Sequence, residues 1–282
     1  MINRVEMKEK AKQVFTGRYW LLVGIFAIIM AITGGAVGIS SAGSSVSSGF
    51  SGTMADSGMS QETAIALVII IAAFSLICSG VAILISIFGT NVLQLGGNRV
   101  SLNAMRGEHY AIKDIFCGFN KQRYFKNVGG MALYTLFIAL PVIIVIIPAE
   151  VFLVLFAVLL STRMPVWAFV ILYIFLTTIV VTAAIIPGLI VQYGLSRVPY
   201  LLVDEDIRPM DAIKKSWRIM VGHKNEYFML RLSFLGWSLL NVVTWGVTGV
   251  FWSTPYMNLT MAEYHDRVMA IEEPEEYPEV VE

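Results

Sequence analysis

Six long apolar runs constrain this chain more than any other feature of its sequence. They are Tyr19–Ile39, Thr63–Phe88, Val128–Ile147, Val166–Ile186, Tyr227–Val243 and Val247–Ala262. A helix needs roughly 20 apolar residues to cross a hydrocarbon core, and most of the runs are about that long. Of the 282 residues, 57% are hydrophobic and only 14% are charged, against roughly 25% charged in an ordinary soluble domain. The sequence predicts an all-α, polytopic membrane protein with about six transmembrane helices.

The connections between the runs pair them into three hairpins. Only Thr244–Gly246 separates the last two runs, which predicts a tight turn. The apolar stretch Val151–Ser161 is too short to span. It is either an extension of the third helix or an interfacial or re-entrant segment. The first run, with its basic start and the small residues after Ser40, partly fits a signal peptide. We favour an uncleaved first span, because the run continues to about Ile39.

The basic residues set the orientation of the predicted helices. With the N-terminus inside, the inner segments together with Arg231 at the inner end of the fifth run hold 19 of the 20 Lys and Arg residues, and the outer segments hold only Arg163. Cytoplasmic loops carry such an excess of positive charge. The outer loop 40–62 is rich in Gly and Ser and nearly uncharged. We therefore predict that the N-terminus and the C-terminus are both cytoplasmic.

An amphipathic segment precedes each hairpin. Its apolar residues recur at helical spacing, with charged residues on the remaining faces. The three sets are Met7, Ala11, Val14 and Phe15; Ile112, Ile115, Phe116 and Phe119; and Ile213, Trp217, Met220 and Val221. Such cytoplasmic amphipathic helices are suited to lie in the membrane interface, where basic residues meet anionic headgroups.

Each hairpin also leaves the membrane in a similar way. Gly89, Pro187-Gly188 and Pro255 precede the pairs Arg99-Val100, Arg197-Val198 and Arg267-Val268. The pattern divides a single membrane domain, 1–271, into repeat units 1–106, 107–206 and 207–271. The other interpretation is that amphipathic segments occur beside the spans of any polytopic protein. The remainder, 272–282, is rich in Glu and contains two prolines, which predicts an acidic disordered tail.

Two segments carry a resemblance to a known family. One is Arg197-Val-Pro-Tyr-Leu-Leu-Val-Asp204, followed by Ala212-Ile-Lys-Lys-Ser-Trp217, Met220-Val-Gly-His-Lys224 and Leu232-Ser-Phe-Leu-Gly-Trp237. The other is Lys8-Glu-Lys-Ala-Lys12 with Gly17 and Tyr19-Trp20. They resemble domain-of-unknown-function family 975, uncharacterised integral membrane proteins of Gram-positive bacteria. The resemblance covers about two-thirds of the chain and is weaker over 128–186. It implies a membrane protein and supplies no functional residues.

Five polar residues are the candidate ligand or lipid contacts. Arg99, Arg197 and Arg267 form an inward-facing basic ring if the repeats surround an axis, or else they snorkel at the interface. Glu150 is the only carboxylate in 128–186, and is either a cation site or an interfacial anchor beside Arg163. Asn241 packs between helices or lines a cavity.

No catalytic, cofactor or metal motif accompanies these residues. Cys78 and Cys117 have no disulfide or metal spacing, and His109, His223 and His265 lie far apart. We therefore expect no enzyme, no cofactor and no nucleic-acid partner. We expect a multi-pass protein of the bacterial cytoplasmic membrane that binds lipid, by anionic headgroups, or a protein partner in envelope homeostasis or protection. The alternative is a small transporter or channel with its site at the hairpin interfaces.

Overall fold

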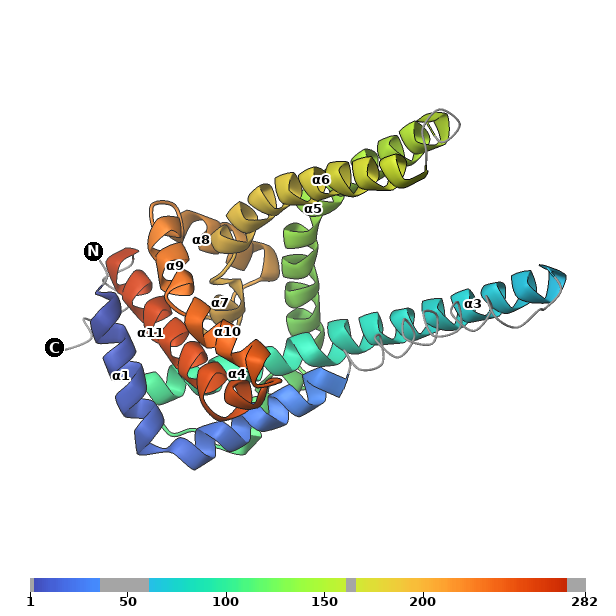
Figure 1. Cartoon of the computed structure of the whole chain (residues 1–282). Helices are drawn as coiled ribbons and strands as arrows, with labels where there is room; N and C mark the ends of the chain where they lie inside the picture. The colour runs from blue at the N-terminus through green and yellow to red at the C-terminus, as the bar shows by residue number, and fades with distance from the viewer. Residues whose placement is uncertain (1–2, 36–60, 161–165, 273–282) are drawn as a thin grey trace. The chain divides into compact units, whose positions relative to one another are not determined.

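The computed structural model describes residues 3–35, 61–160 and 166–272 (Figure 1). Every regular element in these ranges is a helix. The chain divides into two compact units. The first consists of Asn3–Val128 with Phe234–Asp266, and the second of Gly129–Ser233 with Arg267–Glu282. Three parts of the chain lie outside the described residues: most of the predicted outer loop 40–62, Arg163, and residues 273–282.

Within the described residues, three helices are long and apolar enough to cross a membrane. The first, Ile69–Met105, runs through α3 (Gln61–Ile85), the π-helical turn η1 (Ser86–Thr90) and α4 (Asn91–Met105). The second is Tyr124–Leu153 of α5 (Tyr124–Leu160). The third is Ile171–Asp204, through α6 (Val166–Gly194) and α7 (Val198–Asp204). A fourth span is present if two bent helices count as one. These are α1 (Arg4–Gly17) and the helix Tyr19–Gly35, which meet at an angle of 96°.

The structure supports three candidate spans, or up to four, where the sequence predicts six. The difference arises mainly in the last two apolar runs. The run Tyr227–Val243 is divided between two nine-residue helices, α9 (Lys224–Leu232) and α10 (Leu235–Val243). The run Val247–Ala262 contains the π-helical turn η3 (Gly249–Ser253) and continues into α11 (Thr254–Glu272), whose second half is polar. The six-span count therefore stays a prediction.

In the first unit, α10 and α11 form the predicted tight hairpin. The backbone turns at Trp245 and Gly246, which have positive φ values of 53° and 87°. Beyond the turn, Trp237 stacks on Trp252 at 6.3 Å between ring centroids, and Phe234 contacts Tyr256 at 5.6 Å. These pairs set the register of the two antiparallel segments.

The apolar stripe of α1 packs inside the first unit. Met7, Ala11 and Phe15 are fully buried, and Phe15 contacts the edge of the Trp252 ring at 5.2 Å. Three of the four residues of the predicted stripe are therefore buried, and Val14 is half-buried. Protein side chains cover at least these three residues, so they are not available to lipid.

The second amphipathic segment is a short 3₁₀ helix, η2 (Ile112–Phe119). Only Ile115 of its predicted apolar stripe is buried, whereas the other three apolar residues are exposed. The helix lies against α4 because Gly96 has no side chain, since a Cβ there would overlap the Ile115 carbonyl. Gly118 likewise approaches Val92. The close approach of η2 to α4 therefore depends on two glycines.

In the second unit, α5 and α6 form an antiparallel hairpin. Tyr173 of α6 donates a hydrogen bond of 3.3 Å to Glu150 of α5. Nearer the other end of the hairpin, a Cβ on Gly188 would lie 2.9 Å from Val142. Helix α5 continues to Leu160 through Pro141 and Pro148. The stretch Val151–Ser161 is therefore an extension of the third helix as far as Leu160.

The end of α6 carries the shorter helices of the second unit. After Gly194 the chain turns into α7, whose first turn contains Pro199, a position where the missing N–H costs nothing. Helix α8 (Pro209–Ile219) follows, with Asp211 in its first turn and Arg218 in its last. Both charges complement the helix dipole. The chain then turns at Gly222, with φ of 92°, into α9.

Candidate functional site

Ser216 of α8 joins that helix to the end of α6. Its hydroxyl donates a 2.9 Å hydrogen bond to the Gly194 carbonyl and accepts one of 3.2 Å from the Arg197 amide. It is fully buried, so both bonds are shielded from water. One hydroxyl therefore serves a terminal carbonyl of α6 and an amide of the following turn, groups that a helix end leaves without helical partners.

Aromatic rings surround the same end of α6. Trp217 lies directly on Gly194, where a Cβ would come within 2.5 Å of the indole. Tyr193 contacts Tyr227 at 5.4 Å and Phe228 at 6.1 Å between centroids. The ammonium of Lys224 lies 3.9 Å from the centroid of the Trp217 ring. We call Tyr193, Trp217, Lys224, Tyr227 and Phe228 the α6 collar.

Arg197 occupies the interior of this region. It is 1% exposed, and its guanidinium lies 5.0 Å from the ring centroids of both Tyr200 and Tyr227. Its Nε donates to Ser196 at 3.3 Å. A guanidinium over aromatic faces is stabilised by the ring quadrupoles, most strongly when water is excluded. Arg197 is thus a packed interior cation and not a side chain that reaches out to solvent.

Helix α8 presents three sectors around its axis. Ala212, Ile213, Ser216 and Ile219 are buried against the unit. Met210 and Trp217, spaced i and i+7, share a second sector and are 42% and 38% exposed, and Val221, in the turn after the helix, is 61% exposed. We call these three the outer stripe. Lys214 and Arg218 form the third sector, which lies beside the outer stripe around the helix axis. The predicted stripe of Ile213, Trp217, Met220 and Val221 is therefore divided, with Ile213 and Met220 buried and the other two exposed.

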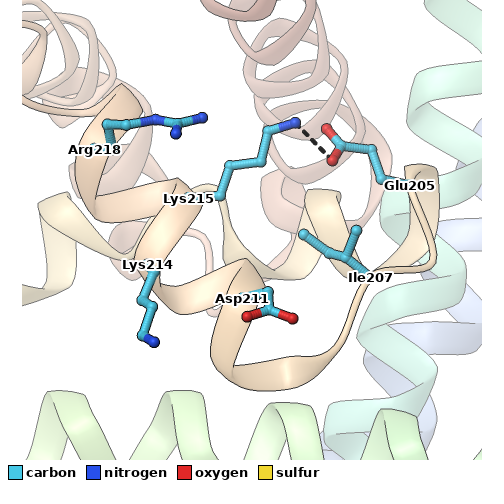
Figure 2. Close-up of a pocket in the computed structure, with 6 residues that line it drawn as sticks. All are labelled: Glu205, Ile207, Asp211, Lys214, Lys215 and Arg218. Atoms are coloured by element: carbon cyan, nitrogen blue, oxygen red, sulfur yellow. Dashed lines mark hydrogen bonds and ion pairs between the residues drawn. The ribbon is translucent and has the colours of Figure 1, made fainter.

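A pocket of about 380 Å³ opens on the charged side of α8. Figure 2 shows its lining of Glu205, Ile207, Asp211, Lys214, Lys215 and Arg218. We call it the basic pocket. Lys215 donates a 2.7 Å hydrogen bond to Glu205, which lies at the end of α7. Arg218 and Lys215 extend toward the same side of the helix (Figure 2). Three cations and two carboxylates leave the lining with one net positive charge.

The pocket has the composition of an anion site. Its lining contains three cations, two carboxylates and one isoleucine. Lysine and arginine side chains bind phosphate and carboxylate groups by charge-assisted hydrogen bonds. Binding of an anionic group is therefore the chemistry that this lining supports.

The structure places the five predicted site residues in separate surroundings. Arg99 is exposed on α4 of the first unit, whereas Arg267 is half-buried on α11 and belongs to the second. Glu150 is half-buried and accepts the bond from Tyr173. Asn241 of α10 packs against Gly249, whose Cβ would lie 2.6 Å from its Oδ1, and accepts a weak 3.5 Å bond from Thr248. None of the five lines the basic pocket.

Sequence reasoning missed the pocket because its walls come from two segments. Lys214, Lys215 and Arg218 recur at i, i+1 and i+4 on one helix, a signal that is visible in the sequence. The opposing Glu205 and Ile207 belong to the turn before the helix, and only the fold brings them opposite. Glu272, assigned to the acidic tail, ends α11 instead, and its carboxylate lies 3.4 Å from Nε2 of His223.

Comparison with known proteins identifies one match. Residues 1–272 match the family described as "Protein of unknown function (DUF975)". The match extends through both units and ends at the last residue of α11. Neither the curated proteins nor the solved structures contain a match to this chain.

Proposed function

The chain belongs to the DUF975 family, and from that premise we propose that it is a non-enzymatic, multi-pass membrane protein that binds anionic lipid headgroups. The proposed setting is the bacterial cytoplasmic membrane, and the proposed role is envelope homeostasis or protection. The observation that carries the proposal is the α6 collar. There, four aromatic rings and the cation of Lys224 surround the end of a helix that is long and apolar enough to span.

The collar combines the two residue types that anchor proteins at a membrane surface. Tyrosine and tryptophan are enriched where hydrocarbon meets headgroups, and lysine and arginine there contact lipid phosphates. Trp217 supplies the amphipathic ring, and Lys224 the cation above it. The outer stripe of α8 gives exposed apolar contact beside Lys214 and Arg218. Each basic residue near an anionic leaflet contributes about 1 kcal/mol of attraction.

The proposed topology has six spans and both termini in the cytoplasm. The three candidate spans and the bent pair at the N-terminus support its first four helices. The hairpin of α10 and α11, whose Val242, Val243 and Trp245 are strongly exposed, supports the last two. The bias of 19 basic residues against one supports the orientation. In this arrangement the α6 collar lies at the cytoplasmic surface.

Topology is tested with reporter fusions made after residues 50, 110, 163 and 215 and at the C-terminus. A phosphatase reporter is active only outside, and a fluorescent reporter folds only inside. We expect outside signals at 50 and 163 and inside signals at the other three positions. An outside signal at 110 or 215 would contradict the proposal.

Lipid binding is tested on the full chain reconstituted in phosphatidylcholine bilayers. Trace amounts of spin-labelled phosphatidylglycerol or phosphatidylcholine report the fraction of each lipid that the protein immobilises. We expect a larger immobilised fraction for phosphatidylglycerol, and a difference that shrinks with added salt because ions screen exposed charges. Lys224→Gln should reduce the preference, whereas Lys121→Gln, in an exposed turn of the first unit, should not. Equal fractions for both lipids would show that the exposed surface serves a protein partner or no ligand.

The transporter alternative finds no support in the basic pocket. A transport site needs polar groups along a path through the apolar region. Glu150 and its partner Tyr173 join two neighbouring helices of one hairpin, and neither lines the basic pocket. A structural role for this pair in fastening α5 to α6 is the simpler interpretation.

A further inference from the structure

We propose that the basic pocket binds a phosphodiester with a single negative charge, the group that joins the headgroup to the lipid in a phospholipid. This inference rests on the proposed function, because the α6 collar is what favours lipid as the source. It goes further by naming the pocket, the chemical group and the residues that select it.

The charge of the lining matches a monoanion. Lys214, Lys215 and Arg218 supply three positive charges, and Glu205 and Asp211 remove two. The ion pair of Lys215 and Glu205, at 2.7 Å, keeps one carboxylate in the wall of the pocket. A phosphodiester carries one negative charge at neutral pH, so it balances the remaining positive charge.

The carboxylates provide discrimination against more highly charged ligands. A phosphomonoester carries about −1.5 to −2 charges at pH 7, since its second pKa is about 6. That additional charge would face Glu205 and Asp211, and like charges repel one another. The pocket should therefore prefer a diester to a monoester, although both contain phosphate oxygens that lysine and arginine can bind.

The size of the pocket favours a substituted phosphate over the bare ion. Its volume of about 380 Å³ lies at the lower end of the range of roughly 300–1,000 Å³ in which proteins hold small ligands. Inorganic phosphate, with five heavy atoms, would fill only part of that space. A phosphodiester with a small alcohol on one side, such as glycerol, fills it better and can also contact Ile207.

The position of the pocket on α8 makes a membrane lipid an accessible source. Lys214 and Arg218 are next to the outer stripe of Met210, Trp217 and Val221 around the helix. If the stripe contacts the hydrocarbon edge, these cations face the level of the lipid phosphates, as snorkelling side chains do. A diester that is still attached to its lipid can then enter the pocket without leaving the bilayer.

The experiment measures which lipids the full chain retains, by native mass spectrometry of protein released from nanodiscs. The nanodiscs contain phosphatidylcholine with either phosphatidylglycerol, a monoanionic diester, or phosphatidic acid, a monoester. We expect wild type to retain phosphatidylglycerol in preference to phosphatidic acid. The double variant K214Q/R218Q should weaken phosphatidylglycerol binding about tenfold, because two charge-assisted contacts are lost. Lys121→Gln, the matched control, should leave it unchanged.

Asp211→Asn separates a selective pocket from a merely basic surface. It raises the net charge of the lining by one without removing a cation. The preference should then shift from phosphatidylglycerol toward phosphatidic acid. The proposed selectivity is overturned if D211N retains phosphatidylglycerol and phosphatidic acid in the same ratio as wild type. It is also overturned if K214Q/R218Q binds phosphatidylglycerol as well as wild type does. If neither wild type nor any variant prefers phosphatidylglycerol to phosphatidylcholine, the proposed function itself is wrong.

Soluble competitors identify the source of the diester. Glycerophosphoglycerol carries the same diester without acyl chains. If it displaces phosphatidylglycerol, the pocket takes the free diester; if only the lipid binds, the source is the membrane. Both results support the proposed chemical group. Displacement by inorganic phosphate at the same concentration as glycerophosphoglycerol overturns it.

Discussion

The two units each contain an ion pair with little exposure, but the two pairs differ in what they connect. In the first unit, Arg106 of the turn after α4 donates to both carboxylate oxygens of Asp266 in α11, at 2.6 and 3.1 Å. These residues are 160 positions apart in the sequence. In the second unit, Lys215 and Glu205 are separated by 10 positions. The pair in the first unit therefore joins two segments that are distant in the sequence. The pair in the second unit joins neighbouring segments and forms part of the wall of the basic pocket.

The two units also use their cations differently. In the first, Lys10 reaches Glu263, whose side chain is 1% exposed, at 2.9 Å, and Arg106 reaches Asp266. Each of these cations ends on a buried carboxylate, which fixes one helix against another. In the second, cations line a pocket with room for a ligand. The ion pairs of the first unit serve the fold, whereas the proposed role of the pocket cations in the second unit is to bind a ligand.

The largest expected effect is that of Asp266→Asn. Removing one partner of a buried pair leaves the other charge without compensation and costs about 3–5 kcal/mol. Because Arg106 keeps 26% of its side chain exposed, we expect about 3 kcal/mol. The measurement is the thermal unfolding midpoint of the purified chain in detergent. Glu205→Gln is the comparison variant. If D266N lowers the midpoint no more than E205Q, the distinction between a fold-closing pair and a local pair is wrong.

Gly194→Ala tests whether packing in the α6 collar stabilises the second unit as much as the buried ion pairs stabilise the first. The added methyl would lie 2.5 Å from the Trp217 ring, and overpacking of this kind costs about 1–3 kcal/mol. Gly129→Ala is the matched control, because nothing lies within 4 Å of a Cβ at that position of α5. Adding Trp217→Leu should restore part of the lost stability. Unchanged unfolding of G194A would show that the indole moves freely.

Much of the helical architecture could be predicted from the sequence, because apolar length and period are local properties. The runs Thr63–Phe88, Val128–Ile147 and Val166–Ile186 each overlap one of the three candidate spans. The buried face of α1 follows from the spacing of Met7, Ala11 and Phe15. A period states only that one face is apolar, however. Whether protein or lipid covers that face depends on distant segments, and the chain covers these residues itself.

The candidate site was less predictable, because its parts depend on turns and on tertiary contacts. Arg99 and Arg197 share the Arg-Val pattern, yet Arg197 is buried between tyrosines whereas Arg99 is exposed. The pattern gives sequence position and no information on burial. Similarly, the interval from Ile213 to Val221 predicts a helix, but it does not show that Ser216 fastens that helix to Gly194.

Glu205→Gln should change binding more than stability. Its pair with Lys215 is local, and we expect a loss of about 1 kcal/mol, at the upper end for a pair that retains some exposure. The variant removes one negative charge from the pocket and releases Lys215 toward a ligand. Retention of phosphatidic acid relative to phosphatidylglycerol should therefore rise, in the same direction as for D211N. A loss of stability as large as that of D266N would place this pair among the structural ones.

The smallest effect concerns a thiol in the first unit, and it leaves the fold unchanged. Burial raises the pKa of Cys117, and this outweighs the neighbouring Arg99, which lowers the pKa. At a given pH the thiolate fraction is therefore smaller than in an ordinary thiol, and only the thiolate reacts rapidly with iodoacetamide. In a Cys78→Ser background, alkylation of the folded chain should be slower than that of the unfolded chain, and its rate should rise toward higher pH.

Arg99→Gln removes the opposing charge, so it should raise the pKa of Cys117 further and slow the alkylation again. Lys121→Gln serves as the control, and equal rates in the two variants would show that the charge of Arg99 does not reach η2. That result would strengthen the contrast with the second unit, where the proposed ligand depends on the field of exposed cations.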